Sequence, residues 1–175
     1  MTGKEFLKQV AHSKDDFLQS FLDLLTRQKA SFCAIGGLAV NAYAEPLVSL
    51  DLDLVVVTEN LEGLMPEFKK KFKIEDFANS INVSSKDSDL RIQIQTDERY
   101  QPFIKRAKKK NVLGYQIPVA AIEDVLQGKI WAAMDETRRP SKRQKDLADI
   151  LRLVESKKEL KDLLPRKLKV QLRID

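Results

Sequence analysis

The stretch FCAIGGLAVNAYAEPLVSLDLDLVVVT, from Phe32 to Thr58, constrains the fold of this chain more than any other part of the sequence. Both of its ends are apolar and have the composition of buried strands, and the pair Gly36-Gly37 closes the first of them. The expected elements are a strand at Phe32–Ile35, a short helix at Leu38–Tyr43, a turn at Glu45–Pro46 and a second strand through Asp51 and Asp53.

Two aspartates share one face of the second predicted strand. Residues two apart on a strand point to the same side, so Asp51 and Asp53 project together while Leu52 and Leu54 point the other way. Neighbouring carboxylates repel each other, and burying them without partners is unfavourable. A hard cation such as Mg²⁺ (or Mn²⁺) relieves the conflict, because it binds one or two carboxylates and takes further oxygens from water and substrate phosphates. Asp51 and Asp53 are therefore the candidate metal ligands.

The glycine pair is the second part of the candidate site. Gly36 and Gly37 have no Cβ, so a phosphate can approach their backbone at a helix start, where free N–H groups and the helix dipole favour anions. A plainer interpretation stays open at this point. The stretch would then be a surface hairpin with two solvated aspartates and a Gly-Gly pair that caps a helix.

A strand, a glycine pair, a short helix and a D-x-D strand, in this order, resemble the nucleotidyltransferase superfamily of the polymerase-beta type. Within it, the chain is similar to small stand-alone bacterial nucleotidyltransferases and to abortive-infection type IV toxins, whose pattern is G-G followed by R-x-[ST]-x-D-[LI]-D. Ser49 occupies the Ser/Thr position, whereas Leu47 stands where the family has arginine. The resemblance extends from about Phe32 to Glu155. It implies that Gly36, Gly37 and Ser49 belong to the nucleotide-binding residues.

The resembled family also takes a third carboxylate from a later strand, and here the sequence departs from it. Leu90–Thr96 alternates strictly between apolar and polar residues, which predicts a half-buried strand. Its polar face offers Gln93 and Gln95, and Asp97 follows two residues later. A glutamine can coordinate a cation through its carbonyl but cannot accept a proton. Either Gln95 occupies the third position, which is the interpretation favoured here, or Asp97 has taken over the role.

Two further candidates lie in the C-terminal third and depend on the same resemblance. Lys129, within GKIWA, matches a family lysine that reaches the active site. The alternative is that its stem lies on an apolar helix face while its ammonium stays in water. Lys142–Glu155 (KRQKDLADILRLVE) resembles the family helix R-x-K-D-[LI]-x-D-[LI], which singles out Lys145 and Asp146. An acidic residue in a first helical turn explains Asp146 without catalysis.

Composition excludes several other classes. The chain has one Cys and one His (Cys33 and His12), so zinc sites, Cys–His nucleophile pairs and an internal disulfide are ruled out. It has no apolar run of membrane-spanning length and no signal peptide, and the expected location is the cytoplasm. The formal net charge is +5. Basic residues cluster in the runs Lys69–Lys73, Lys105–Lys110 and Arg138–Lys145, and such clusters attract polyanions.

The remaining patterns predict the outline of the chain. Ser13 and Asp16 resemble a capping box for a helix at about Lys14–Lys29, and a second helix begins near Thr58. Further predictions are one or two strands in Phe72–Ser85, a turn at Lys86–Asp89, a basic helix at Glu98–Lys110, a strand at Val112–Val119, a helix at about Ala121–Asp135 and a charged helical tail broken by Pro165.

The expected fold is α/β (α+β), a small mixed sheet with flanking helices and a helical C-terminal portion. We expect one domain over residues 1–175, with its core at about 31–119 and the helical portion at about 120–175. The resemblance implies Mg²⁺-dependent transfer of a nucleoside monophosphate from a nucleoside triphosphate to an acceptor hydroxyl. The acceptor stays open among tRNA, another RNA, a protein and an aminoglycoside-like small molecule. The alternatives are a catalytically degenerate fold that acts as a binding partner or antitoxin, and a plain basic RNA-binding module.

Overall fold

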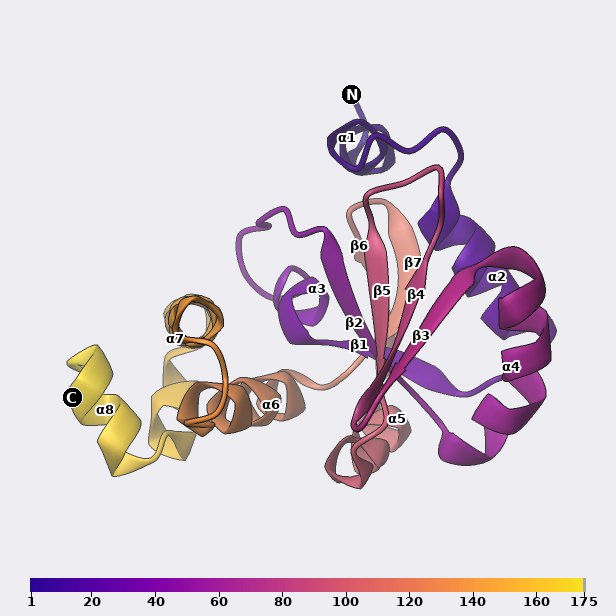
Figure 1. The fold of residues 1–175 in the computed structure, drawn as a ribbon. Helices are drawn as coiled ribbons and strands as arrows, with labels where there is room; N and C mark the ends of the chain where they lie inside the picture. The colour runs from indigo at the N-terminus through magenta and orange to yellow at the C-terminus, as the bar shows by residue number, and fades with distance from the viewer. Residues whose placement is uncertain (175) are drawn as a thin grey trace.

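The sheet contains the motif strands at its centre. In the computed structural model, which describes residues 1–174, seven strands form one mixed sheet in the order β3-β4-β5-β2-β1-β7-β6 (Figure 1). The strands are β1 (Phe32–Ile35), β2 (Asp51–Val56), β3 (Lys73–Phe77), β4 (Ser80–Ser84), β5 (Arg91–Gln95), β6 (Lys108–Val112) and β7 (Tyr115–Val119).

Helices lie on both sides of this sheet (Figure 1). One side is covered by α2 and α4, and the other by α3 and the C-terminal helices, with α6 and α7 contacting α3. The helices are α1 (Gly3–Val10), α2 (Phe17–Arg27), α3 (Gly36–Val40), α4 (Thr58–Lys71), α5 (Gln101–Arg106), α6 (Ile122–Met134), α7 (Pro140–Ser156) and α8 (Arg166–Leu172), with the 3₁₀ turns η1 (Glu98–Tyr100) and η2 (Lys158–Leu163). This architecture confirms the predicted fold class.

The two faces of the central strands differ as their alternating sequences predict. On β2 and β5, Leu52, Leu54, Ile92 and Ile94 are fully or almost fully buried. They belong to the core under α2 and α4, where Phe21 stacks on Phe68 at 5.1 Å between ring centroids. The opposite face therefore carries the polar side chains of both strands.

The N-terminal segment is organised differently from the prediction. The expected capping box at Ser13 and Asp16 is wrong: Asp16 alone caps α2, by accepting a hydrogen bond from Gln19 N at 2.9 Å. The capping box of this region lies at Thr2 and Glu5, at the start of α1, which was not predicted. The Ser13 hydroxyl instead contacts Ser88 Oγ at 2.5 Å, so a contact distant in sequence uses the side chain that the local pattern had assigned to the helix.

The predicted helix at Glu98–Lys110 is correct only in its first part. Helical structure ends at Arg106, and the lysines that follow form β6, which pairs with β7 along its full length. A tight turn at Leu113–Gly114, with positive φ at both residues, separates these two strands. The single strand expected at Val112–Val119 is therefore a hairpin, because pairing with β7 outweighs the helical periodicity of the basic run.

Two further predictions concern the short helix after β1 and the segment Phe72–Ser85. The helix expected at Leu38–Tyr43 is α3, which already begins at Gly36 and ends at Val40. Phe72–Ser85 contains two strands, β3 and β4, one of the two expected outcomes. Among residues 1–174, none of the helices combines the length and the apolar character that crossing a membrane requires.

Candidate active site

Asp53 lies directly against the glycine turn. It is paired with Ile35 in the antiparallel register of β1 and β2, and Gly36 follows Ile35 with φ +61°. A Cβ built on Gly36 would collide with the Asp53 carboxylate, so this position excludes every other side chain as long as Asp53 is present. Burial raises the pKa of the Asp53 carboxyl, and the positive charge of Lys129 opposes the shift only in part.

Asp51 is held by two cations from different parts of the chain. Its Oδ1 accepts hydrogen bonds from Arg91 Nε at 3.0 Å and Nη2 at 2.6 Å, and its Oδ2 accepts one from Lys142 Nζ at 2.7 Å. Burial by itself would raise the pKa of Asp51, but the bonds from Lys142 and Arg91 outweigh it, and the pKa lies below its ordinary value. Both cationic side chains are more than one third exposed.

Lys129 is the centre of a second, buried group of charges. Its Nζ donates a hydrogen bond to Asp146 Oδ1 at 2.9 Å and forms an ion pair with Asp149 Oδ2 at 2.7 Å. Burial would lower the pKa of Lys129, but Asp149 and Asp146 outweigh this effect and raise it. Lys129 is therefore charged and tightly held, and the snorkelling alternative does not describe it, because its side chain is only 7% exposed.

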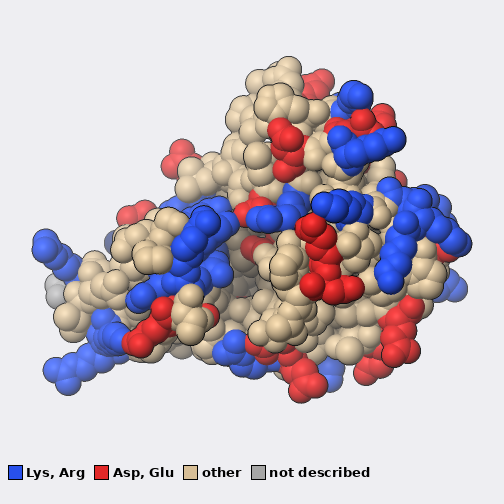
Figure 2. All heavy atoms as spheres, viewed as in Figure 1, with Lys and Arg blue, Asp and Glu red and all other residues tan. Residues whose placement is uncertain are grey.

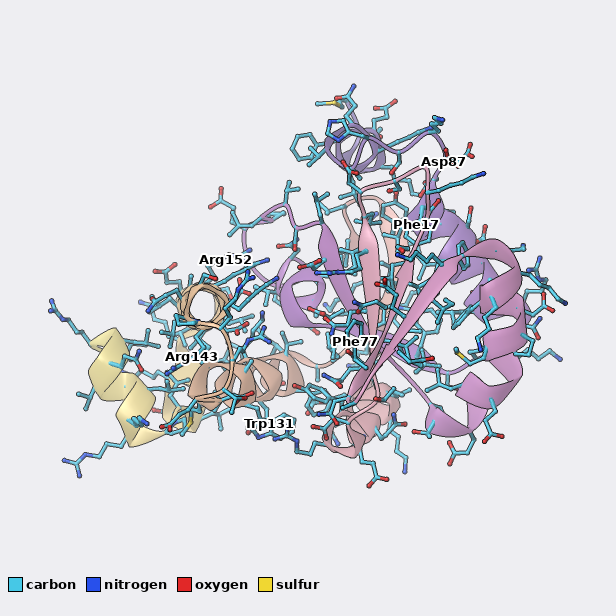
Figure 3. All side chains as sticks on the ribbon, viewed as in Figure 1. Phe17, Phe77, Asp87, Trp131, Arg143 and Arg152 are labelled. Atoms are coloured by element: carbon cyan, nitrogen blue, oxygen red, sulfur yellow. The ribbon has the colours of Figure 1, made fainter. Side chains whose placement is uncertain are left out.

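Two arginines, one just before α7 and one within it, extend this buried group in two directions. Arg138 Nε donates to Asp146 Oδ2 at 2.6 Å, and Arg152 Nη1 donates to Asp149 Oδ1 at 2.7 Å. Arg152, labelled on α7 in Figure 3, also contacts the carbonyl of Glu45 through its guanidinium, in the connection between α3 and β2. Both buried aspartates of α7 thus connect Lys129 to neighbouring segments.

Three other predicted residues differ in their contacts: Ser49, Lys145 and Gly37. Ser49 Oγ donates to the Asp51 carbonyl at 3.0 Å and accepts from Lys145 Nζ at 3.1 Å, so the two residues carried over from the family pattern contact each other. A Cβ on Gly37 would meet nothing within 4 Å, which means that this glycine faces open space.

The register of β2 and β5 shows how the candidates for the position of the third carboxylate lie relative to Asp53. Asp53 is level with Gln93, and Gln95 is level with Val55. Gln95 Oε1 accepts hydrogen bonds from the backbone N–H groups of Thr96 and Asp97, at 3.0 and 3.2 Å. The Asp97 carboxylate is bound by Arg99 at 2.7 Å and caps η1. The residue directly across from Asp53 is therefore Gln93.

Two adjoining cavities meet at Asp53. We call the first the cationic cavity, about 150 Å³ in volume; it is lined by Asp51, Asp53, Arg91, Gln93, Lys129, Arg138, Lys142, Lys145 and Asp146. We call the second the aromatic cavity, about 110 Å³ in volume; its lining includes Ile35, Gly36, Asp53, Gln93, Gln95, Tyr100, Phe103, Asp124, Val125, Gly128, Lys129, Ala132, Arg138 and Asp146. The predicted residues Asp51, Asp53, Gln95, Lys129, Asp146, Gly36 and Lys145 thus line one or both cavities, whereas Gly37 and Ser49 do not.

Several residues of this site were not selected from the sequence. Arg91 and Lys142 hold Asp51 from 40 and 91 positions away, and such contacts leave no local pattern. Arg138 lies in the basic run Arg138–Lys145, so a signal for it existed, but the run also fits a solvated helix start. Asp149 shares a helix face with Asp146, and this spacing is visible in the sequence.

A central strand with two aspartates, a glycine turn against one of them, and a cationic cavity beside both define the class of nucleotidyltransferases. Solved structures with the same fold agree. The antibiotic-resistance factor ANT(2'')-Ia has a TM-score of 0.59 and 13% identity, with 89% of each chain covered. The lincosamide antibiotic adenylyltransferase LnuA, in a lincomycin-bound structure, has a TM-score of 0.56 and 13% identity, covering 81% of this chain and 99% of its own. An antigenic nucleotidyltransferase-like protein from Paracoccidioides brasiliensis has a TM-score of 0.55 and 16% identity, covering 97% and 93%.

The family is shown by the sequence itself. Residues 35–173 match the family described as nucleotidyl transferase AbiEii toxin of type IV toxin–antitoxin systems. The chain therefore belongs to the AbiEii family of nucleotidyltransferases, and this confirms the resemblance stated above. A search among curated proteins gives no match.

Proposed function

We propose that this chain transfers a nucleoside monophosphate from a nucleoside triphosphate to an acceptor hydroxyl, with release of pyrophosphate, in a reaction that depends on Mg²⁺ or Mn²⁺. The observation that carries the proposal is the place of Asp51 and Asp53 on β2. Asp53 lies against Gly36, and both carboxylates line the cationic cavity. Membership of a nucleotidyltransferase family supports the reaction class.

The donor set fits a divalent ion that is completed by its substrate. Because Gly36 has no Cβ, the Asp53 carboxylate can lie directly against its backbone, where any Cβ would collide with it. Among residues 1–174, no group of three His, Cys, Asp or Glu side chains forms a metal site, and Mg²⁺ typically uses one or two carboxylates together with substrate phosphates. Asp51 and Asp53 would hold the ion, which when bound would neutralise charge on the triphosphate and activate the attacking oxygen.

The cationic cavity would bind the triphosphate. Arg91, Lys142 and Lys145 lie in its wall, and the first two form contacts with Asp51 that are partly exposed and can be exchanged for phosphate oxygens. Lys129 would add a fixed positive charge, oriented by Asp146. Gly36, which borders the adjoining aromatic cavity, and Gly37 would allow a phosphate coordinated to the same ion as Asp53 to approach the backbone.

A glutamine would replace the third carboxylate, and the register of β2 and β5 supports Gln93 for this role. Gln95 was favoured from the sequence, whereas Gln93 is level with Asp53. If the position directly across from Asp53 is the functional one, Gln93→Asp should supply an oxygen ligand and a general base and raise transfer, and Gln95→Asp should change it little. The reverse result would support Gln95. If Asp97 has taken over, Asp97→Asn should abolish transfer.

RNA, including tRNA, is the acceptor that the charge distribution favours. Lys and Arg side chains gather over the α7 side of the molecule and again over the end of α4, with a smaller group between them (Figure 2). The basic run Arg138–Lys145 contributes three residues to the cationic cavity itself. Clustered cations of this kind bind nucleic-acid backbones. A small-molecule acceptor is the alternative, since an adenylyl-tobramycin complex of ANT(2'')-Ia has the same fold.

A second candidate function is binding without catalysis, as a degenerate member of the family that acts as a partner or antitoxin. The contacts at Asp51 favour it, because both of its oxygens are occupied by protein cations. The absence of a carboxylate at Gln93 and Gln95 points the same way. Since the family is that of type IV toxins, an antitoxin partner protein is also expected for an active toxin.

The decisive experiment incubates the purified chain with each labelled nucleoside triphosphate, total RNA and Mg²⁺. Label should move to an acceptor in wild type and not in Asp53→Asn. Calorimetry on the same proteins should show that triphosphate affinity falls when Mg²⁺ is omitted or Asp53 is replaced. Equal affinity in all three conditions would contradict the site, and transfer that survives in both Asp51→Asn and Asp53→Asn would belong to a contaminant.

A further inference from the structure

The connection between α3 and β2 joins the two halves of the candidate site. It runs over residues 41–50 and contains turns but neither helix nor strand. The glycine pair lies just before it, and the backbone N–H of Asn41 donates to the Gly37 carbonyl at 3.3 Å. Asp51 follows directly at its end, as the first residue of β2. The path of this connection therefore affects how the glycine pair and Asp51 lie relative to each other.

The side chain of Asn41 closes the connection into a loop. Its Nδ2 donates to the Leu47 carbonyl at 2.8 Å, and its Oδ1 accepts from the Leu47 backbone N–H at 2.9 Å. Asn41 thus pairs with both backbone groups of one residue, as a neighbouring strand would do. Asparagine side chains commonly stabilise turns in this way, because the backbone groups of a loop have no regular partners.

Arg152 of α7 holds the same loop from outside. Its Nη2 donates to Asn41 Oδ1 at 3.1 Å and also contacts the Glu45 carbonyl, while its Nη1 donates to Asp149 Oδ1 at 2.7 Å. The side chain of Arg152 is only 16% exposed. One planar guanidinium therefore serves three acceptors from two segments, which the single nitrogen of a lysine cannot do with the same geometry.

Arg152 is the least exposed of three cations on α7 that contact this segment. Lys145 Nζ donates to Ser49 Oγ at 3.1 Å, and Lys142 Nζ donates to Asp51 Oδ2 at 2.7 Å. Lys142 is 37% exposed, and both lysines line the cationic cavity. When these lysines exchange their partners for phosphate, as the proposed function requires, Arg152 still joins the loop to α7.

We propose that Arg152 is a positioning residue for the transfer reaction. Through Asn41 and the Glu45 carbonyl it fixes the loop, and through the loop it fixes the placement of Asp51 relative to the glycine pair. In the lining described for residues 1–174, Arg152 borders neither the cationic nor the aromatic cavity, so it acts without touching the reactants. A misplacement of about 1 Å in such a site can lower the rate about 100-fold. This inference rests on the proposed function.

The test uses two variants that loosen the loop and one matched control. Arg152→Lys keeps the charge beside Asp149 but cannot serve all three acceptors. Asn41→Ala removes both bonds to Leu47. The control is Asn111→Ala, which also loses a bond from an asparagine side chain to a backbone N–H, that of Gly114 at 2.9 Å, in the turn between β6 and β7.

The first readout is hydrogen exchange, followed by mass spectrometry on peptides that cover residues 41–50. It reports on the loop itself and needs no substrate. Exchange should be about tenfold faster in Arg152→Lys and in Asn41→Ala, because each loses bonds that close the loop. The Asn111→Ala protein should exchange like wild type in these peptides.

The second readout is transfer from labelled nucleoside triphosphate to total RNA with Mg²⁺. The kcat of Arg152→Lys and of Asn41→Ala should fall about 10- to 100-fold, with the triphosphate KM within about twofold of wild type. Calorimetry gives the number of triphosphates bound per chain, which counts folded protein and separates a slower site from partial unfolding. The double variant should be no slower than the slower single variant, because both replacements act through one loop.

The possible results decide between the alternatives. Faster exchange and a lower kcat at full binding stoichiometry support the inference. Unchanged exchange in Arg152→Lys overturns it, and so does a wild-type kcat, additive losses in the double variant, a parallel loss of stoichiometry or an equal loss in Asn111→Ala; the proposed function stands in each of these cases. If wild type neither binds nor transfers triphosphate, the proposed function fails, and Arg152 is then a structural residue only.

Discussion

Two groups of charged residues meet at Asp53, and they differ in how firmly the protein holds them. In the first, Asp51 is bound by Arg91 and Lys142, whose side chains are 46% and 37% exposed. In the second, Lys129 is bound by Asp146 and Asp149, and all three side chains are at most 7% exposed. The geometry of the contacts is similar, with distances between 2.6 and 3.0 Å in the first group and 2.7 and 2.9 Å in the second.

The difference in exposure separates an exchangeable group from a structural one. Ion pairs at the surface contribute about 0–1 kcal/mol, and water or a ligand can replace them. A buried pair that loses one partner leaves an uncompensated charge, which is destabilising by about 3–5 kcal/mol. The first group can therefore exchange its partners, as the proposed function requires, while the second fixes Lys129 and joins α6 to α7.

The largest effect is expected in the buried group. Asp149→Ala should lower the free energy of unfolding by about 3–5 kcal/mol, because it removes the ion pair of Arg152 and weakens the compensation of the buried Lys129 charge. Urea unfolding followed by circular dichroism measures the loss. The double replacement Lys129→Met with Asp149→Leu removes both charges and should be less destabilised than Asp149→Ala. A loss below about 1 kcal/mol in Asp149→Ala would show that the group is not structural.

Asp53 lies between the two groups, and its replacement is expected to change the free energy of unfolding less and in the opposite direction, towards higher stability. Because burial raises the pKa of Asp53, its ionised form opposes folding at neutral pH. Asp53→Asn should therefore raise the free energy of unfolding at pH 7 by about 1 kcal/mol, although it should abolish the proposed transfer.

The pH dependence of the same pair of proteins provides the check. A raised pKa means that the contribution of Asp53 to stability is fully present below about pH 4 and is lost as the pH rises through the folded-state pKa. The advantage of Asp53→Asn should then shrink as the pH falls from 7 towards 4. An advantage that is constant over this range would exclude the ionisation of Asp53 as its cause.

The smallest effect on stability is expected in the exposed group. Lys142→Ala should change the free energy of unfolding by less than about 1 kcal/mol, and less still at high salt. Its effect should instead fall on the triphosphate, with affinity about tenfold lower after loss of one charged hydrogen bond. Lys157→Ala, which removes an exposed pair with Glu123, is the matched control and should leave affinity unchanged.

Lowering the pH should weaken the contribution of Asp51 to stability, whereas it should strengthen that of Asp53. The pKa of Asp51 is lowered, so its contribution to stability is present above about pH 4 and is lost as the pH falls through the folded-state pKa. Wild type should therefore lose more stability than Asp51→Asn below pH 4. Parallel stability curves for the two proteins would contradict the contacts with Arg91 and Lys142.

Local patterns in the sequence were sufficient for the strands that carry the motif. The run Phe32–Ile35, the glycine pair and the alternation of Leu90–Thr96 each depend on near neighbours, and the structure contains β1, the turn and β5 at these places. The charged partners could not be found in this way. Arg91 reaches Asp51 only because β2 and β5 are parallel neighbours, which is a property of the sheet and not of either strand.

Register supplies information that the sequence alone does not contain. From the sequence, Gln93 and Gln95 are equivalent because both lie on the polar face of one strand; only the pairing of β5 with β2 makes Gln93 level with Asp53. The lysines of β6 had a helical pattern, and their pairing with β7 decided against it. In both cases a segment distant in the chain, or a hairpin partner, supplies the deciding contact.

The close approach of Gly36 and Asp53 has a consequence for how this family can diverge. As long as the carboxylate is present, a side chain at position 36 meets it, and φ +61° adds strain for most residues. Loss of the Asp53 carboxylate alone would not make exchange at position 36 tolerable, because the Cβ of residue 53 would still lie 2.9 Å from the new Cβ. Among relatives, a residue other than glycine at this position is therefore expected only together with a change in the path of the turn or of the strand beside it.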